Sequence, residues 1–134
     1  MRVEVVFDSD GHYAIEYKGG TIAPGPGPLP APPVLFLGSL GACAGIFAVD
    51  YLRARGLPFS GLKVTAEAGH AEEPRRLADI HVRVILPTAV EERHMPPLRR
   101  AVDLCTLKNT LTNPPAITTE LTPAVGSGTT AEPA

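Results

Sequence analysis

The sequence predicts an α+β fold in which strands pair as antiparallel hairpins and helices cover one face of the sheet. Short runs of alternating apolar residues are joined by turn signals, which is typical of hairpins. A long, nearly continuous apolar segment from Pro33 to Gly56 has the length of a helix. The predicted order, βββ-α-ββ-α-α-β, contains no βαβ repeat, so we expect antiparallel sheets rather than a parallel one.

The first elements form a hairpin. Residues 2–7 and 12–17 each alternate, and Asp8-Ser9-Asp10-Gly11 between them is a turn signal. Lys18-Gly19-Gly20 ends the second run, and Thr21-Ile22 adds a short third strand.

Residues 23–33 then read APGPGPLPAPP, in which prolines exclude a helix or an interior strand. We prefer an ordered connection over the surface to a flexible linker, because hydrophobic structure resumes at once.

The segment after Pro33 is expected to form a helix buried on most sides, because its apolar face is nearly continuous. Arg53 near its end suits the helix dipole, and Gly56 followed by Pro58 is a typical stop. Several of its residues are small enough to let another backbone approach closely: Gly38, Ser39, Gly41, Ala42, Ala44 and Gly45.

The second half contains a long hairpin, two helices and a last strand. The hairpin strands alternate, the helices are separated just before Cys105, and Asn113-Pro114-Pro115 stops the second helix. The expected elements are a strand at 62–68, a polar loop at 70–76, a strand at 77–86, helices at 91–103 and 105–111, and a strand at 116–121.

Length and composition define the class of protein. The 134 residues fit a single domain, 1–125, and the small, polar residues 126–134 predict a disordered tail. The net charge of −2, with basic residues scattered along the chain, excludes a nucleic-acid-binding footprint. The glycine-rich stretches match no phosphate-binding loop, which excludes nucleotide binding.

The chain is expected to be soluble and cytoplasmic, with no membrane partner. Its longest apolar stretch, Val34 to Val49, ends at Asp50 and is shorter than the ~20 residues that span a bilayer. The N-terminal residues read as a strand and not as a signal peptide.

Two cysteines are the strongest chemical candidates. Cys43 lies in the apolar helix and Cys105 at the start of a later helix. Each is either a buried small hydrophobe or a reactive thiol, and the helix start favours reactivity for Cys105. The four histidines show no metal-ligand spacing, so we expect no metal and no cofactor, although a zinc site with both cysteines stays an unsupported alternative.

Four features of the sequence, in the order in which they occur, resemble the OsmC/Ohr family, the osmotically inducible protein C and organic hydroperoxide resistance proteins. They are the helix LFLGSLGACAGIFAVDYL, the later segment AVDLCTLKNTL, a β-hairpin in the roughly sixty residues between the cysteines, and a final strand. The resemblance extends from about Met1 to Leu121, and the chain is similar to a divergent OsmC-like member.

The resemblance implies an intertwined homodimer, with sheets from both chains around central buried helices and active sites at the subunit interface. It implies that Cys43 is the peroxidatic thiol and Cys105 the resolving thiol of a peroxidase that reduces small apolar hydroperoxides. An external dithiol would reduce the resulting disulfide.

The sequence departs from the family at two positions. Family peroxidases pair an Arg from the first hairpin turn with a Glu before the cysteine helix. Here Ser9 stands at the first position, and Pro33 or Val34 at the second. The alternative function is therefore a non-catalytic, homodimeric stress or small-ligand-binding protein. His12 is either a surface residue or close to the site, and Asp50 is either exposed or a buried partner of Arg53 or Arg99.

Overall fold

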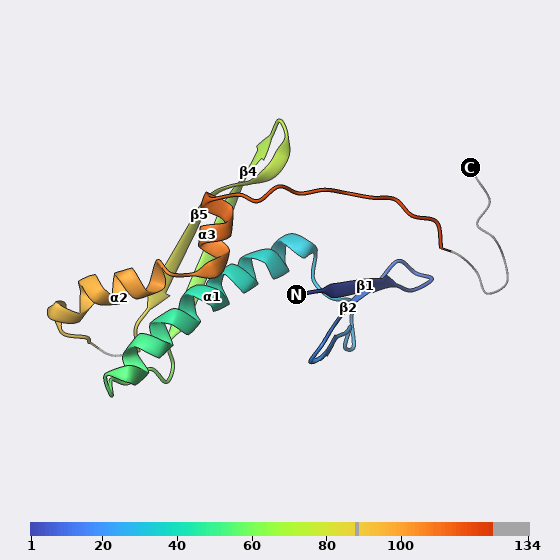
Figure 1. Ribbon diagram of the computed structural model, residues 1–134. Coiled ribbons are helices and arrows are strands. Elements are labelled where there is room, and N and C mark those ends of the chain that lie inside the picture. Colours follow the sequence, from blue (N-terminus) through green and yellow to red (C-terminus); the bar gives the residue numbers. More distant parts are fainter. Residues whose placement is uncertain (88, 125–134) are drawn as a thin grey trace.

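The computed structural model describes residues 1–87 and 89–124, and its described elements follow the expected order except for a last strand (Figure 1). The predicted tail at 126–134 lies outside these residues. The elements are β1 (Val3–Phe7), β2 (Tyr13–Tyr17), β3 (Gly20–Ile22), α1 (Pro32–Ala54), β4 (Lys63–Glu72), β5 (Arg75–Ile85), the 3-10 helix η1 (Glu92–His94), α2 (Met95–Val102) and α3 (Thr106–Thr112). Both sheets are antiparallel, which confirms the α+β class.

The N-terminal sheet has the order β1-β2-β3, as predicted. Phe7 pairs with Tyr13 at the end of the first hairpin. The carboxylate of Asp8 accepts hydrogen bonds from the backbone N–H groups of Asp10, at 2.9 Å, and His12, at 3.0 Å. The turn is thus closed by its own side chain, as Asp in such turns commonly does.

This sheet has no packing partner among the described helices and strands. Its Cα atoms come within 8 Å of no other helix or strand in the described chain, and Figure 1 shows it beyond the N-terminal end of α1. One polar contact ties it to the proline-rich connection, because the Tyr13 hydroxyl donates to the Pro30 carbonyl at 2.6 Å. That contact favours the ordered connection. The large apolar residues of the sheet remain exposed: Val3, Val5, Val6, Phe7, Tyr17 and Ile22.

The central helix α1 packs on β4, β5, α2 and α3. Gly45 permits the close approach of β4, since a Cβ there would lie 3.1 Å from Cγ2 of Val64. The prediction of burial on most sides is wrong for the single chain, because these neighbours cover only one stripe of the helix. Val34 and Ile46 are more than half exposed. The buried stripe consists of Leu40, Gly41, Ala44, Gly45, Ala48, Tyr51 and Leu52.

The helix α1 is also longer than the apolar stretch seen in the sequence. By length and composition alone it could cross a membrane, a test that core helices of soluble proteins also pass. Its buried stripe packs with Leu98 of α2 into the core of the domain.

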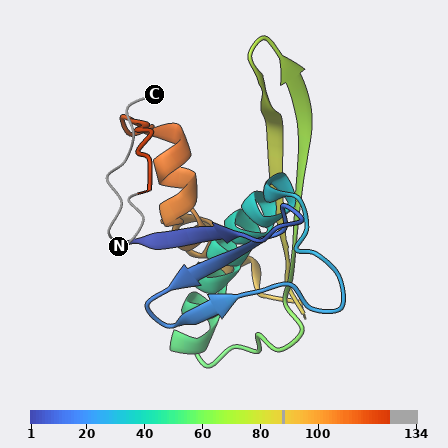
Figure 2. The ribbon, with the colours of Figure 1, turned by 90° about the vertical axis from the view of Figure 1, so that its right-hand side faces the viewer.

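The second sheet is the hairpin β4-β5, whose tip projects beyond the helices (Figures 1 and 2). The predicted polar loop at 70–76 is wrong: the strands continue to Glu72 and Arg75, which face each other. Polar composition suggested a loop, but backbone pairing and this opposite-charge pair keep the exposed tip in strand conformation.

The end of the described chain also differs from the prediction. Residues 114–124 carry no strand; they run as an extended segment away from α3 (Figure 1). Ile117 is 85% exposed and Leu121 is 94% exposed. Alternation alone does not make a strand, because a strand needs a hydrogen-bonded neighbour, and the described chain supplies none here.

Candidate functional site

The two cysteines lie together where the start of α3 meets the middle of α1. Cys43 belongs to α1, and Cys105 directly precedes α3. Both are free thiols, and their side chains are within hydrogen-bonding reach of each other. The structure therefore brings together the two residues that the sequence singled out.

Cys105 is held in place as the N-cap of α3. Its backbone, at φ −48° and ψ 117°, is not helical, and its sulfur accepts the backbone N–H of Lys108 at 3.5 Å. An N-cap acceptor satisfies one of the N–H groups that the first turn of a helix leaves without a carbonyl partner. The residue is 1% exposed and is one of the best buried in the domain.

Cys43 is half-buried and faces the same helix start. Burial raises the pKa of its thiol, but hydrogen bonding from the backbone of Leu107, from the Cys105 thiol and from the backbone of Thr106 outweighs burial, so the net pKa is lowered. Thr106 and Leu107 are the first two residues of α3, and their N–H groups have no partner inside the helix. The free N–H groups of α3 therefore favour a thiolate at Cys43.

The pKa of Cys105 moves in the opposite direction. Burial raises it, the N–H of Lys108 lowers it in part, and the neighbouring Cys43 raises it through hydrogen bonding and charge. The pair consequently divides into one thiol that ionises more readily and one that keeps its proton. This division suits a nucleophile beside a proton-bearing second thiol.

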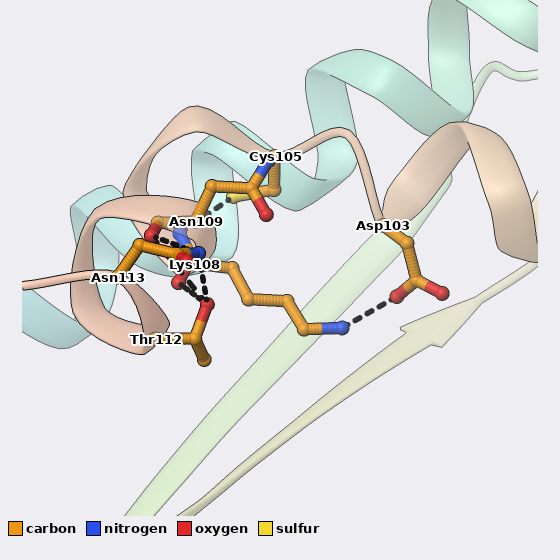
Figure 3. A network of polar contacts seen from close by, with 6 residues as sticks. All are labelled: Asp103, Cys105, Lys108, Asn109, Thr112 and Asn113. Carbon is orange, nitrogen blue, oxygen red and sulfur yellow. Dashed lines mark hydrogen bonds and ion pairs between the residues drawn. The ribbon is translucent and has the colours of Figure 1, made fainter.

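A network of polar contacts surrounds Cys105 (Figure 3). Lys108 Nζ lies 2.5 Å from the Asp103 carboxylate. The Thr112 hydroxyl donates to the Lys108 carbonyl at 3.0 Å, and the Asn113 amide donates to the Asn109 carbonyl at 3.1 Å. These contacts hold the short helix α3 at both of its ends.

Charged side chains are not among the groups that set the Cys43 pKa in the described part of the chain. His12 is exposed in the β1–β2 turn, with its Nδ1 3.8 Å from Oδ2 of Asp8. The sheet that this turn connects contacts no other described element. Asp50 pairs with Arg53 at 3.7 Å, and both are exposed. Asp50 is therefore exposed in the single chain, and Arg53 is the one of its two expected partners that it contacts.

One cluster in residues 1–87 and 89–124 has metal-like spacing, and it contains neither cysteine. Ligand atoms of Asp8, Asp10 and His12 lie within 4.8 Å of one another in the exposed β1–β2 turn. Asp8 already accepts two backbone N–H groups there. The hydrogen bonds that close the turn account for the proximity of these three side chains.

An open groove of about 1240 Å³ runs between β5 and the helices α2 and α3, and Cys105 lines it. Leu40 and Ala44 of α1 and Leu98 of α2 contribute apolar surface to the groove. Charged side chains line it as well, among them Arg83, Arg99 and Lys108, so the groove is more polar than most pockets for small apolar molecules.

Sequence reasoning missed four residues of this site: Asp103, Thr106, Leu107 and Lys108. Thr106 and Leu107 act through their backbone, which no residue type reveals. Lys108 lies three residues after Cys105, at the N3 spacing of an N-cap contact, so treating Cys105 as a cap would have indicated it.

Solved structures share this architecture at low sequence identity. One is a Psychrobacter arcticus protein named for the osmotic-stress-induced and detoxification response, with a TM-score of 0.70 and 17% identity over 82% of this chain and 87% of that chain. Another is a hypothetical protein of Aquifex aeolicus, with a TM-score of 0.67 and 22% identity over 84% of this chain and 87% of that chain. These similarities establish the fold.

Among curated proteins, none matches the chain significantly. The model of the OsmC-like protein family matches residues 25–120, a range that contains both cysteines, α1 and the β4-β5 hairpin. Since this match covers more than half of the chain, the protein belongs to the OsmC-like family.

Proposed function

We propose that this protein is a thiol-dependent peroxidase that reduces organic hydroperoxides, with Cys43 as the peroxidatic and Cys105 as the resolving residue. The observation that carries the proposal is the placement of the two thiols side by side at the start of α3, where their surroundings lower the pKa of Cys43 and raise that of Cys105. The thiolate is the reactive form of cysteine, and Cys43 is the thiol whose pKa is lowered.

The chemistry has three steps. The Cys43 thiolate attacks one oxygen of the hydroperoxide, the O–O bond breaks, and with one proton the products are a sulfenic acid and an alcohol. The Cys105 sulfur then attacks the sulfenic sulfur, a disulfide forms, and water leaves. An external dithiol reduces the disulfide by thiol–disulfide exchange and becomes a disulfide itself.

The substrate preference follows from the residues around Cys43 on α1. Phe36 and Phe47 lie seven residues before and four residues after it, which places them on the same face of the helix. Both are at least partly exposed, so they can contact an alkyl group. Each methylene buried there contributes about 0.8 kcal/mol, and hydrogen peroxide has none.

We also infer that the working form is a homodimer. The N-terminal sheet has no partner in its own chain, α1 exposes Val34 and Ile46, and residues 114–124 are extended without a neighbouring strand. A second copy covers these surfaces without any new element. Light scattering at micromolar concentration should give twice the chain mass, and a folded monomer would contradict the inference.

We propose that the protein is soluble and cytoplasmic, with no membrane or nucleic-acid partner. The cytoplasm keeps thiols reduced and supplies dithiol reductants, both of which this cycle needs. Fractionation of cells should place the protein with the soluble cytoplasmic fraction, and recovery with membranes would argue against this location.

The enzyme assay compares two oxidants and two reductants. Purified protein should consume cumene hydroperoxide faster than hydrogen peroxide. A dithiol should sustain turnover better than a monothiol, because one dithiol molecule completes both steps of the thiol–disulfide exchange. Equal rates with both peroxides would remove the alkyl preference. If no dithiol supports peroxide consumption, the protein is not a peroxidase.

A second candidate function rests on the missing charged partner of Cys43. Ser9 stands where family peroxidases carry their Arg, and Pro33 or Val34 where they carry their Glu. In the described residues only backbone and thiol groups lower the Cys43 pKa. A homodimeric protein that binds a small apolar ligand would tolerate these changes. Calorimetry with a redox-inert analogue such as cumyl alcohol, on a preparation that consumes no peroxide, separates the candidates: tight binding favours ligand binding.

A further inference from the structure

An ion pair joins α2 and α3 across the turn that carries Cys105. Asp103 is the C-cap of α2, and Lys108 lies in the first turn of α3. Their side chains meet with Lys108 Nζ 2.5 Å from Asp103 Oδ1 (Figure 3). Three residues, Asp103, Leu104 and Cys105, lie between the helices, so the pair closes the loop that contains the second thiol.

The same lysine also contacts Cys105 directly. Its backbone N–H donates to the Cys105 sulfur at 3.5 Å, and its carbonyl accepts the Thr112 hydroxyl at 3.0 Å. One residue therefore connects the sulfur, the ion pair and the far end of α3.

The packing of α3 makes these polar contacts important. Thr106–Thr112 contains no buried residue, so little apolar contact fixes the helix against the domain. Its N-cap, Cys105, is 1% exposed and is the buried anchor at this end. A helix held in this way depends on its cap and on the ion pair for its orientation.

The charges are placed against the helix dipoles. A carboxylate at the C-terminus of α2 and an ammonium in the first turn of α3 are each unfavourable for their own helix. The reverse arrangement would stabilise both helices, so helix stability does not account for Asp103 and Lys108. What the observed arrangement supplies is a link between the two helices on either side of Cys105.

We propose that Asp103 and Lys108 are positioning residues that orient the Cys105 thiol toward Cys43 and so set how readily the two cysteines form a disulfide. A disulfide needs its Cα atoms within about 7 Å and a narrow range of torsions, so small movements of α3 change its formation. The biological role of the pair rests on the proposed peroxidase cycle, in which the Cys105 sulfur attacks the Cys43 sulfenic acid and water leaves.

The test measures the dithiol–disulfide equilibrium of Cys43 and Cys105 in glutathione buffers, which needs no peroxide. Oxidised glutathione supplies the oxidising equivalents: two thiols lose two protons and two electrons, and two glutathione molecules form. Both side chains of the pair are about half exposed. Lys108→Met and Asp103→Asn should therefore lower the equilibrium constant for disulfide formation about two- to fivefold.

The controls separate positioning from general stability. Lys108→Arg keeps the charge and should restore the equilibrium constant. Arg93→Met removes a comparable exposed ion pair, Arg93 to Glu91 at 2.8 Å, and should leave the constant unchanged. Because each test variant also removes an unfavourable dipole interaction, the thermal midpoint should stay close to that of the wild type. Salt of about 1 M should bring the wild type toward the variants.

Equilibrium constants of Lys108→Met and Asp103→Asn equal to the wild-type value would overturn the proposal. The proposal would also fail if Lys108→Arg did not restore the equilibrium constant. It would fail too if the equilibrium constant fell in proportion to the thermal midpoint in all variants, Arg93→Met included. A failure of the peroxidase cycle is recognised separately, since the wild type would then form the disulfide in glutathione and consume no hydroperoxide.

Discussion

The middle of α1 and the start of α3 present the same side chain, a cysteine, to each other in different backbone environments. Around Cys43 the N–H groups of α1 are used inside the helix, whereas the first turn of α3 after Cys105 leaves N–H groups without carbonyl partners. The lowered pKa belongs to Cys43, the thiol opposite those free groups. The comparison teaches that the backbone of a neighbouring element, and not the cysteine's own helix, selects which thiol ionises.

The largest expected effect comes from removing the more acidic thiol. Cys43→Ser should abolish peroxide consumption, because a hydroxyl is not ionised near neutral pH and cannot attack the O–O bond. A coupled assay that follows dithiol oxidation measures this. The variant should still fold as the wild type does by circular dichroism. Full activity in Cys43→Ser would reverse the assignment of the two cysteines.

Removing the second thiol should stop the cycle after its first step. Cys105→Ser keeps an oxygen that can cap α3, so Cys43 should still be oxidised once per chain. Without a resolving thiol the sulfenic acid should persist, react with dimedone and go on to the sulfinic acid in excess peroxide. Mass spectrometry of the dimedone adduct tests this. A rapid loss of the sulfenic acid without any adduct would mean that another group resolves it.

A smaller effect should follow from removing one free N–H group of α3. Thr106 is the first residue of the helix, a position that accepts proline, and the extended ψ of Cys105 suits a residue before proline. Thr106→Pro should therefore keep the helix and raise the Cys43 pKa, by about half a unit to one unit. The pH dependence of Cys43 alkylation measures the shift.

The matched control for this variant is Thr106→Ala, which changes the side chain and keeps the N–H group. It should leave the Cys43 pKa at its wild-type position. Equal shifts in Thr106→Ala and Thr106→Pro would show that the side chain, and not the backbone donor, acts on Cys43.

Much of the fold could be predicted because local signals agreed with the packing. The Asp8–Gly11 turn and the end of the long helix at Gly56 both depend on local backbone conformation, and both were predicted from the sequence. The continuous hairpin at 70–76 could not be predicted, since its polar residues resemble a loop and only the pairing partner keeps them in strands.

The burial of α1 and the strand at 116–121 were predicted from composition and alternation. The single chain covers only one stripe of α1 and gives residues 116–121 no neighbouring strand. In the site, the two cysteines were found by residue type. The backbone donors of Thr106 and Leu107 were not, because a donor of this kind depends on where a helix starts and not on what its side chains are.

Cys43 and Cys105 are neighbouring thiols whose pKa values are shifted in opposite directions, that of Cys43 downward and that of Cys105 upward. The most direct test is alkylation of the wild type by iodoacetamide over a range of pH, with each cysteine followed by mass spectrometry. A lowered pKa gives thiolate at lower pH. The pH at which alkylation is half-maximal should therefore lie below that of an unperturbed thiol for Cys43 and above it for Cys105. A Cys43 midpoint at or above that of Cys105 would contradict the account.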